Sequence, residues 1–133
     1  MTSDPVAAML AGDRASRALG IELAELAPGR AVARMRITAD MVNGHATAHG
    51  AFVFAVADTA FACACNSHGP VTVAAGASIT FVAPAREGDE LVAEAIERTR
   101  FGRNGVYDVT VRRDDEVVAE FRGLSRTVGG DAR

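Results

Sequence analysis

A run of mostly apolar residues from Ala48 to Ser67 limits the folds open to this chain more than any other stretch. It contains no proline and one glycine, Gly50, near its beginning. About 20 residues form a helix of roughly 30 Å, and a helix that is apolar on every side is buried. One carboxylate interrupts the run, that of Asp58. We therefore predict a buried central helix, with Asp58 as the first candidate for chemistry because an unpaired buried carboxylate is costly.

Composition and charge narrow the class of protein. The 133 residues correspond to one domain over 1–133, and a hydrophobic share of 49% is enough for a core. A net charge of −3 without a basic tract argues against nucleic-acid binding. The apolar run is long enough to span a membrane, but its central carboxylate and the lack of flanking lysine or arginine favour a core helix.

The compartment expected from the sequence is the cytoplasm. The N-terminal residues do not form the pattern of a secretory signal. Cys63 and Cys65 would point about 200° apart on a helix, so they cannot pair with each other. Two unpaired thiols in the core are typical of a reducing compartment.

The rest of the chain predicts one more helix and six strands. Asp4-Pro5 is a typical helix start and Gly20 a typical end, which predicts a helix over 5–18. A loop with an Asn-Gly signal is expected at Phe101–Gly105, a tight hairpin at Asp114-Asp115, and a loose tail at 129–133. Alternating or apolar runs predict strands at 21–26, 31–38, 71–83, 89–99, 106–113 and 116–128.

The order of these elements predicts an α+β fold. Four successive strands joined by short turns form an antiparallel sheet, and the apolar helix needs a concave face to cover it. We therefore expect an antiparallel sheet wrapped around one long buried helix. The open edges of such a sheet favour pairing with a second copy of the chain.

Several short motifs resemble those of the hotdog-fold thioesterases of phenylacetate degradation. Three of them fall close together: Asn43-Gly44-His45, His49-Gly50 and Ala57-Asp58-Thr59-Ala60-Phe61. Others follow in the order of the family: Ala64-Cys65-Asn66-Ser67, Gly105-Val106-Tyr107-Asp108 and Phe121-Arg122-Gly123. The chain departs from the family at Ala51, where a glycine is common, and at Cys63, where an aromatic residue is common.

The resemblance implies a hotdog fold, hydrolysis of aryl-CoA thioesters of the phenylacetyl-CoA or hydroxyphenylacetyl-CoA type, and a homodimer or dimer of dimers. It implies that Asp58 is the catalytic carboxylate and that the Gly50 N–H polarises the thioester carbonyl. His49 and Asn43 would line the site. No cofactor or metal is implied, since coenzyme A is part of the substrate. Apart from the resemblance, candidates for contact with the substrate are Thr59, Phe52, Phe54 and Phe61, with a place in the core as the alternative for the phenylalanines.

The chemistry of these residue types fits the resemblance but leaves alternatives open. A carboxylate can attack a thioester itself or deprotonate a water, and burial raises its pKa. The alternative for Asp58 is a structural aspartate that hydrogen-bonds to a neighbouring loop or strand. A glycine N–H at a helix N-terminus can stabilise an oxyanion, and the alternative for Gly50 is a packing role.

The spacing of Gly50 and Asp58 has a consequence for the assembly. Eight positions on one helix separate two residues by about 12 Å along the axis. The attacking group and the oxyanion donor must both lie within about 3 Å of the reacting group. We therefore expect two antiparallel helices of a homodimer, with Gly50 of one subunit near Asp58 of the other.

Other polar residues give weaker signals. His45 and His49 have the spacing of zinc ligands on a helix, but the glutamate of such motifs and a third ligand are missing. Helix capping or substrate contact is the favoured interpretation of His49. Arginines near the 101–105 loop are candidates to bind the phosphates of coenzyme A, with a solvated sheet edge as the alternative. The residues concerned are Arg98, Arg100 and Arg103, with Gly102.

Two other functions are weighed against hydrolysis. A hydratase or dehydratase acting on CoA thioesters usually needs an acid–base pair, and Ala62 stands where a partner of Asp58 one helical turn away would be. A non-catalytic acyl-CoA-binding module would have no use for a buried carboxylate. The sequence leaves the choice between covalent and water-mediated attack open.

Overall fold

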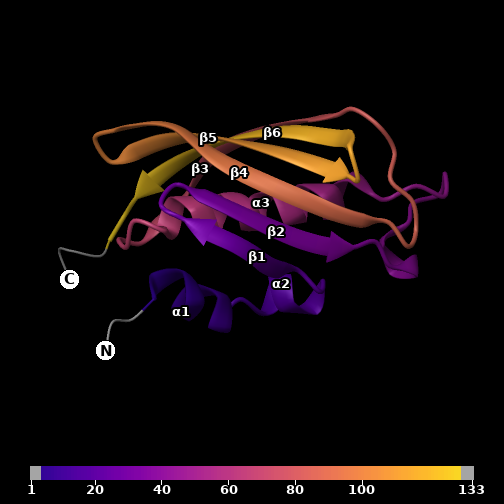
Figure 1. Cartoon of the computed structure of the whole chain (residues 1–133), viewed down its shortest axis with the longest axis horizontal. Coiled ribbons are helices and arrows are strands. Elements are labelled where there is room, and N and C mark those ends of the chain that lie inside the picture. Colours follow the sequence, from indigo (N-terminus) through magenta and orange to yellow (C-terminus); the bar gives the residue numbers. More distant parts are fainter. Residues whose placement is uncertain (1–3, 130–133) are drawn as a thin grey trace.

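A curved sheet surrounds one long helix in the computed structural model, which describes residues 4–129 (Figure 1). The helix, α3, spans Gly50–Asn66, and the sheet has the strand order β1-β2-β4-β5-β6-β3 with every neighbouring pair antiparallel. The strands are β1 (Glu22–Ala27), β2 (Arg30–Arg36), β3 (Thr72–Phe81), β4 (Glu90–Phe101), β5 (Asn104–Arg113) and β6 (Glu116–Thr127). The predicted α+β hotdog arrangement is confirmed.

The predicted helix over 5–18 is two helices, α1 (Pro5–Ala11) and α2 (Arg14–Ala18). The break occurs at Gly12 and Asp13 because the Asp13 side chain accepts a hydrogen bond from the Ser16 N–H and so starts a new helix. A short 3₁₀ helix, η1 (Ala39–Met41), was not predicted. Of the expected tail, Gly129 donates its N–H to the Val71 carbonyl at 3.3 Å, and the rest lies outside the described residues.

Of the two turns predicted between strands, one is confirmed and the other is shorter than predicted. The Asp114-Asp115 hairpin is confirmed, with Asp114 at φ 53°. The expected 101–105 loop is shorter, because Asn104 already pairs with Phe101. Gly102, at φ 58°, and Arg103 alone make the turn, so the Asn-Gly pair belongs to β5.

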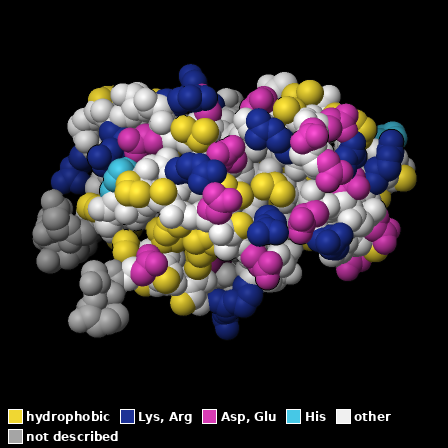
Figure 2. All heavy atoms as spheres, in the orientation of Figure 1, with side chains coloured by type: hydrophobic (Ala, Val, Ile, Leu, Met, Phe, Trp, Pro, Cys, Tyr) yellow, Lys and Arg dark blue, Asp and Glu magenta, His cyan; other side chains and the backbone are white. Residues whose placement is uncertain are grey.

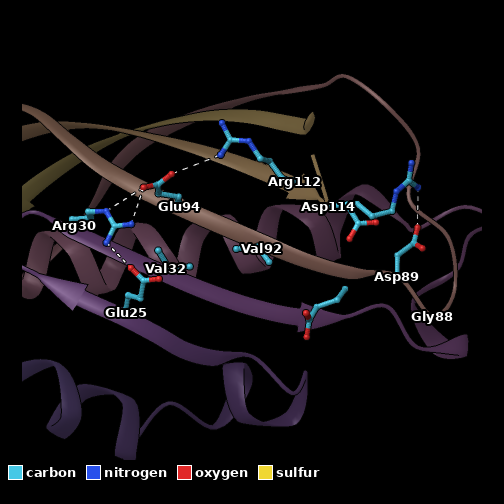
Figure 3. A pocket seen from close by; sticks show the side chains of 11 residues that line it. Glu25, Arg30, Val32, Gly88, Asp89, Val92, Glu94, Arg112 and Asp114 are labelled. Atoms are coloured by element: carbon cyan, nitrogen blue, oxygen red, sulfur yellow. Dashed lines mark hydrogen bonds and ion pairs between the residues drawn. The ribbon is translucent and has the colours of Figure 1, made fainter. Parts of the chain in front are cut away.

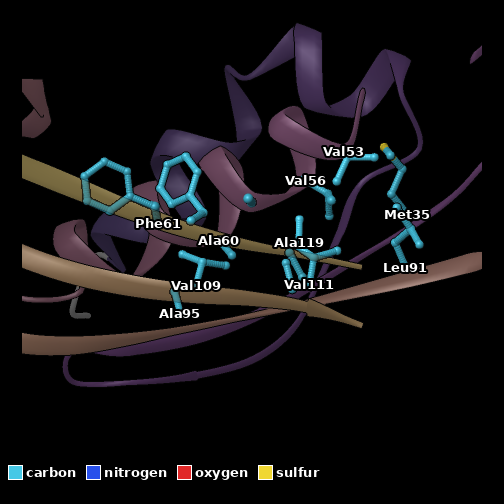
Figure 4. Packing of buried hydrophobic residues seen from close by; sticks show 14 of the residues in the cluster. Met35, Val53, Val56, Ala60, Phe61, Leu91, Ala95, Val109, Val111 and Ala119 are labelled. Carbon is cyan, nitrogen blue, oxygen red and sulfur yellow. The ribbon is translucent and has the colours of Figure 1, made fainter. Parts of the chain in front are cut away.

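The core lies between α3 and the inner face of the sheet. Val53, Val56 and Ala60 of the helix face the strands (Figure 4). Several inward positions of the sheet are alanine, which lets the helix approach closely. These alanines are Ala31 and Ala33 of β2 and Ala93 and Ala95 of β4.

The two cysteines are free and buried, and burial raises the pKa of both thiols to about 12. Cys63 and Cys65 are therefore small core residues, as predicted. Among residues 4–129, no helix has the length and apolarity that a membrane crossing requires.

Gly123, in the motif Phe121-Arg122-Gly123, has a role in core packing. The ring of Phe61 lies over this residue, and a Cβ atom placed on Gly123 would come within 2.7 Å of the ring. Phe61 also packs edge-on against Tyr107, with 5.5 Å between ring centroids. Glycine at 123 therefore leaves the space that the Phe61 ring occupies.

We expect Gly123→Ala to lower the free energy of unfolding by about 1–3 kcal/mol, because it overpacks the core beneath Phe61. Equilibrium denaturation in urea measures the loss. Gly76→Ala is the matched control, since its Cβ would meet Leu124 at an ordinary 3.6 Å. A loss at Gly123 no larger than that at Gly76 would contradict the packing argument.

Candidate active site

Asp58 lies midway along α3 and lines a cavity of about 190 Å³ between that helix and residues 13–21. Its side chain is half-buried and makes no hydrogen bond within residues 4–129. Burial raises the pKa of this carboxyl, and the negative charge of nearby Asp13 raises it further. The carboxylate is therefore a stronger base than an exposed aspartate and is open to a ligand.

A chain of hydrogen bonds ties α2 to α3 beside this carboxylate. The Ser16 hydroxyl donates to Asp13 Oδ2 at 2.6 Å and lies 2.9 Å from the hydroxyl oxygen of Thr59. Ser16 is 7% exposed, so the link is sheltered from water. Thr59, a predicted substrate contact, lines the same cavity as Asp58.

The N-terminus of α3 presents a free backbone donor. His49 caps the helix, with Nδ1 accepting the Ala51 N–H at 3.1 Å, so the predicted capping role is confirmed. The Gly50 N–H has no acceptor in the described part of the chain. A Cβ on Gly50 would lie 2.9 Å from Phe81 Cζ, so the absence of a side chain lets β3 approach. Both proposed roles of this glycine are compatible with the geometry.

Asn43 shapes the loop that precedes α3. Its Oδ1 accepts the backbone N–H of His45 at 2.8 Å and both the N–H and the hydroxyl of Thr47 at 3.2 Å. The Asn43 N–H donates to the Thr47 carbonyl at 2.8 Å. These bonds fix the path of the chain into His49, which itself donates its N–H to the Met41 carbonyl at 2.7 Å.

The single chain keeps the two halves of the predicted site apart. Gly50 lines a cavity of about 410 Å³ at the start of α3, and Asp58 lines the other one beside α2. No described cavity contains both residues. Within the same 4–129 range, no three His, Cys, Asp or Glu side chains are grouped as a metal site would require.

The two predicted phenylalanine contacts have different positions. Phe61 is 1% exposed and belongs to the core, packed against Tyr107 and Phe121. It is not among the lining residues of the cavities described for residues 4–129, and its contact with the substrate stays a prediction. Phe52 is half-buried near the start of α3, with its ring 6.2 Å from that of His49.

The three arginines predicted to bind phosphate have different surroundings. Arg98 pairs with Asp108 at 2.8 Å, and Arg122 binds the same carboxyl. Hydrogen bonds from Arg122 and Arg98 outweigh its partial burial and lower the pKa of Asp108 to about 2. Arg100 and Arg103 line a small cavity of about 50 Å³ together with Gly102. Arg100 contacts Glu97 at a longer 3.6 Å, and Arg103 donates to the Thr127 carbonyl at 3.3 Å.

A larger cavity, about 540 Å³, is a groove on the outer face of the sheet (Figure 3). Arg30 in this groove pairs with Glu25 and Glu94, each at 2.9 Å, and Glu94 also contacts Arg112 at 3.7 Å. Acidic and basic side chains are likewise interspersed over the face seen in Figure 2. Because these charges are largely paired and lie on the side of the sheet away from α3, we do not assign the chemistry to this groove.

The residues that sequence reasoning missed come from α2. Asp13 and Ser16 stand beside Asp58, yet Ser16 and Thr59 are 43 positions apart in the chain. The only signal was the preference of aspartate for a helix N-cap. Nothing in that preference says which part of α3 the short helix meets.

Comparison with known proteins places the chain among thioesterases. The sequence profile of the thioesterase superfamily matches residues 45–120. Acyl-coenzyme A thioesterase PaaI of Escherichia coli K12 is 44% identical over 124 residues, which are 92% of this chain and 89% of the relative.

Solved structures give the same result. The E. coli PaaI protein from the phenylacetic acid degradation operon superposes with a TM-score of 0.92 and 42% identity over 95% of this chain and 92% of that one. A mutant of the phenylacetic acid degradation protein PaaI from Thermus thermophilus gives a TM-score of 0.84 and 37% identity, over 87% of this chain and 100% of that one.

We expect Asp58→Asn to raise the melting temperature at pH 7 by about 1–3 °C, because asparagine does not carry the cost of a half-buried charge. Since the pKa of Asp58 is raised in the folded state, its charge lowers stability as pH rises through that pKa. The gain from asparagine should therefore shrink as pH falls. Calorimetry at several pH values measures it, and a clear loss of stability at pH 7 would instead mark a structural aspartate.

Proposed function

This chain belongs to the thioesterase superfamily, and we propose that it hydrolyses aryl-CoA thioesters to the free acid and coenzyme A. The observation that carries the proposal is the Asp58 carboxylate, half-buried, without a hydrogen bond in the described chain, and facing a cavity. The phenylacetic acid degradation operon of the E. coli relative supports an aryl substrate of the phenylacetyl-CoA or hydroxyphenylacetyl-CoA type.

Asp58 would act as nucleophile or general base. In the first route its oxygen attacks the thioester carbon, and the C–S bond breaks so that coenzyme A leaves as a thiolate. Water then hydrolyses the anhydride, which frees the acid and the Asp58 carboxylate and releases a proton for the thiolate. In the second route it takes a proton from a water that attacks the same carbon, and the proton leaves with the thiol of coenzyme A. Both routes need a basic carboxylate, which agrees with the raised pKa of Asp58.

The start of α3 would stabilise the negative charge that develops on the carbonyl oxygen. The Gly50 N–H is free in the described chain and lies at the positive end of the helix. Because His49 Nδ1 accepts the Ala51 N–H, the neutral ring carries its proton on Nε2 and can donate it to the substrate. Asn43 would position this segment through its three accepted hydrogen bonds.

A homodimer would bring Gly50 of one subunit to Asp58 of the other, giving two sites per dimer, and two dimers would associate into a tetramer. The edge strand β3 supports a partner surface. Val73 is 44% exposed and Phe81 54%, and the adjoining Val71 and Val82 are similarly open. Such an apolar edge is a template for pairing. The free buried cysteines support a reducing compartment, the cytoplasm.

The phosphates of coenzyme A would bind Arg100 and Arg103. Both line the small cavity beside the β4–β5 turn, and Gly102 in that turn has no side chain to obstruct a nucleotide. Arg98 is the weaker candidate because its ion pair with Asp108, at 2.8 Å, is closer than the 3.6 Å contact of Arg100 with Glu97. No specific observation favours the hydratase or binding-module alternatives.

The central test is release of thiol from a panel of aryl-CoA and alkyl-CoA thioesters. We expect the wild type to prefer aryl substrates and Asp58→Asn to lose about 10²–10⁴-fold in kcat, because asparagine cannot serve as base or nucleophile. Activity of the wild type should be lost as pH is lowered through the pKa of Asp58, because protonation removes the base. This loss should occur at a higher pH than the pKa of an ordinary aspartate. If Asp58→Asn turns over thioesters as fast as the wild type, Asp58 has a structural role and not a catalytic one.

Gly50 can be tested with two matched substitutions. Proline is favourable at the first position of a helix, and His49 at φ −64° and ψ 134° suits the residue before proline. Gly50→Pro removes the N–H, whereas Gly50→Ala adds a Cβ beside Phe81 but keeps it. We expect kcat of the proline variant to lie about 10²–10³-fold below that of the alanine variant. Similar rates would remove the N–H from the mechanism.

The same variants test sharing of the site between subunits. A mixed dimer of Asp58→Asn and Gly50→Pro chains has one site with both changes and one with neither, if each site combines the two subunits. Activity should then return when the inactive chains are mixed and allowed to exchange. Failure to recover in dimers shown to be mixed would contradict the shared site.

A further inference from the structure

The lining of the cavity beside Asp58 combines polar and apolar side chains. Asp13, Ser16 and Thr59 are polar, and Leu19 and Ile21, which follow α2, are apolar. A ligand with a polar reacting group and an apolar end would find both kinds of contact there.

The helix side of the cavity is open because its residues are small. Ala55, Asp58, Thr59 and Ala62 have the spacing of one helical face. The two alanines on this face leave space that a larger side chain would fill. The face points toward α2, opposite the residues Val56 and Ala60 that pack on the sheet. The cavity therefore lies outside the main core but directly next to the carboxylate.

The volume of the cavity suits a single aromatic ring. A cavity of about 150 Å³ in an apolar protein interior takes up benzene, and this one measures about 190 Å³. A single aromatic ring is therefore of a size that this cavity can hold.

The α2 side of the cavity is held in place although α2 is only five residues long. A helix of this length is not stable alone. The Asp13 cap and the contact between the Ser16 and Thr59 hydroxyls fix its start, and the Ile21 N–H donates to the Ser16 carbonyl at 2.9 Å. Leu19 and Ile21 are thus positioned before any ligand arrives.

We infer that α2 and Ile21 form one side of the acyl pocket: the aryl group of the substrate lies between Leu19, Ile21 and the Ala55–Ala62 face of α3, with its carbonyl toward Asp58. The inference rests on the proposed function and adds Leu19 and Ile21 to the residues proposed to contact the acyl group. It makes the N-terminal helices, rather than the sheet, the element that sets the preference for acyl groups.

Ala15→Leu tests the pocket against a control on the same helix. Ala15 is exposed at the margin of the cavity, whereas Ala18 is exposed on α2 but does not line it. Filling the pocket should lower kcat/KM for phenylacetyl-CoA about 10-fold or more and change that for acetyl-CoA less than about 3-fold. Ala18→Leu should leave the ratio of the two values unchanged. The opposite substitution, Leu19→Ala, should raise relative activity toward a larger naphthylacetyl-CoA.

A measurement without turnover separates this inference from the proposed function. Phenylacetamide is a neutral probe of the aryl group, and its ring should shift the methyl NMR signals of Leu19, Ile21 and Ala62 in the wild type. The shifts should be absent in Ala15→Leu and kept in Ala18→Leu. Such shifts without hydrolysis of any thioester would support the pocket and overturn the function. Hydrolysis with an unchanged substrate ratio in Ala15→Leu, or probe shifts confined to other residues, would overturn the pocket and leave the function standing.

Discussion

The packing of α3 onto a sheet with alanine at many inward positions is the contact on which the rest of this structure depends. Close approach leaves no room for water or charge on the sheet side of the helix, where Val56 and Ala60 are completely buried. A carboxylate on α3 is tolerable only on the opposite side, which the short helix α2 covers incompletely. The position of Asp58 between core and solvent follows, and with it the raised pKa of its carboxyl.

The rigidity of α3 links the two electrostatic features of the proposed site. Its N-terminus carries the free Gly50 N–H, held by the His49 cap and the Asn43 loop, and its middle carries Asp58. A straight helix keeps these groups about 12 Å apart, so one chain cannot place both on one thioester. Under the proposed function, the exposed edge β3 and a two-fold partner resolve this separation, and α2 holds the substrate from the remaining side.

Predictions from local pattern succeeded where one physical effect dominated. The apolar run predicted α3 within two residues at its start and one at its end, and alternating or apolar runs predicted all six strands. Errors arose where a nearby interaction competed. The Asp13 cap divided the predicted 5–18 helix, and pairing of Asn104 with Phe101 shortened a loop. Phe61 and Arg98 were assigned to ligands by residue type, and these assignments stay predictions. Within the chain, Phe61 packs over Gly123 and Arg98 pairs with Asp108.

The sequence by itself determined the class of fold and the pair of residues at the centre of the proposed chemistry, because hydrophobic periodicity, turn residues and helical spacing act over short stretches of chain. Only the tertiary structure decided what surrounds Asp58. The contact of Ser16 with Thr59, which are 43 positions apart, the size of the cavity and the lack of a hydrogen bond to the carboxylate within the described residues depend on segments far apart in the chain. No local preference specifies such a contact, since it results from how the N-terminal helices dock on a core already formed.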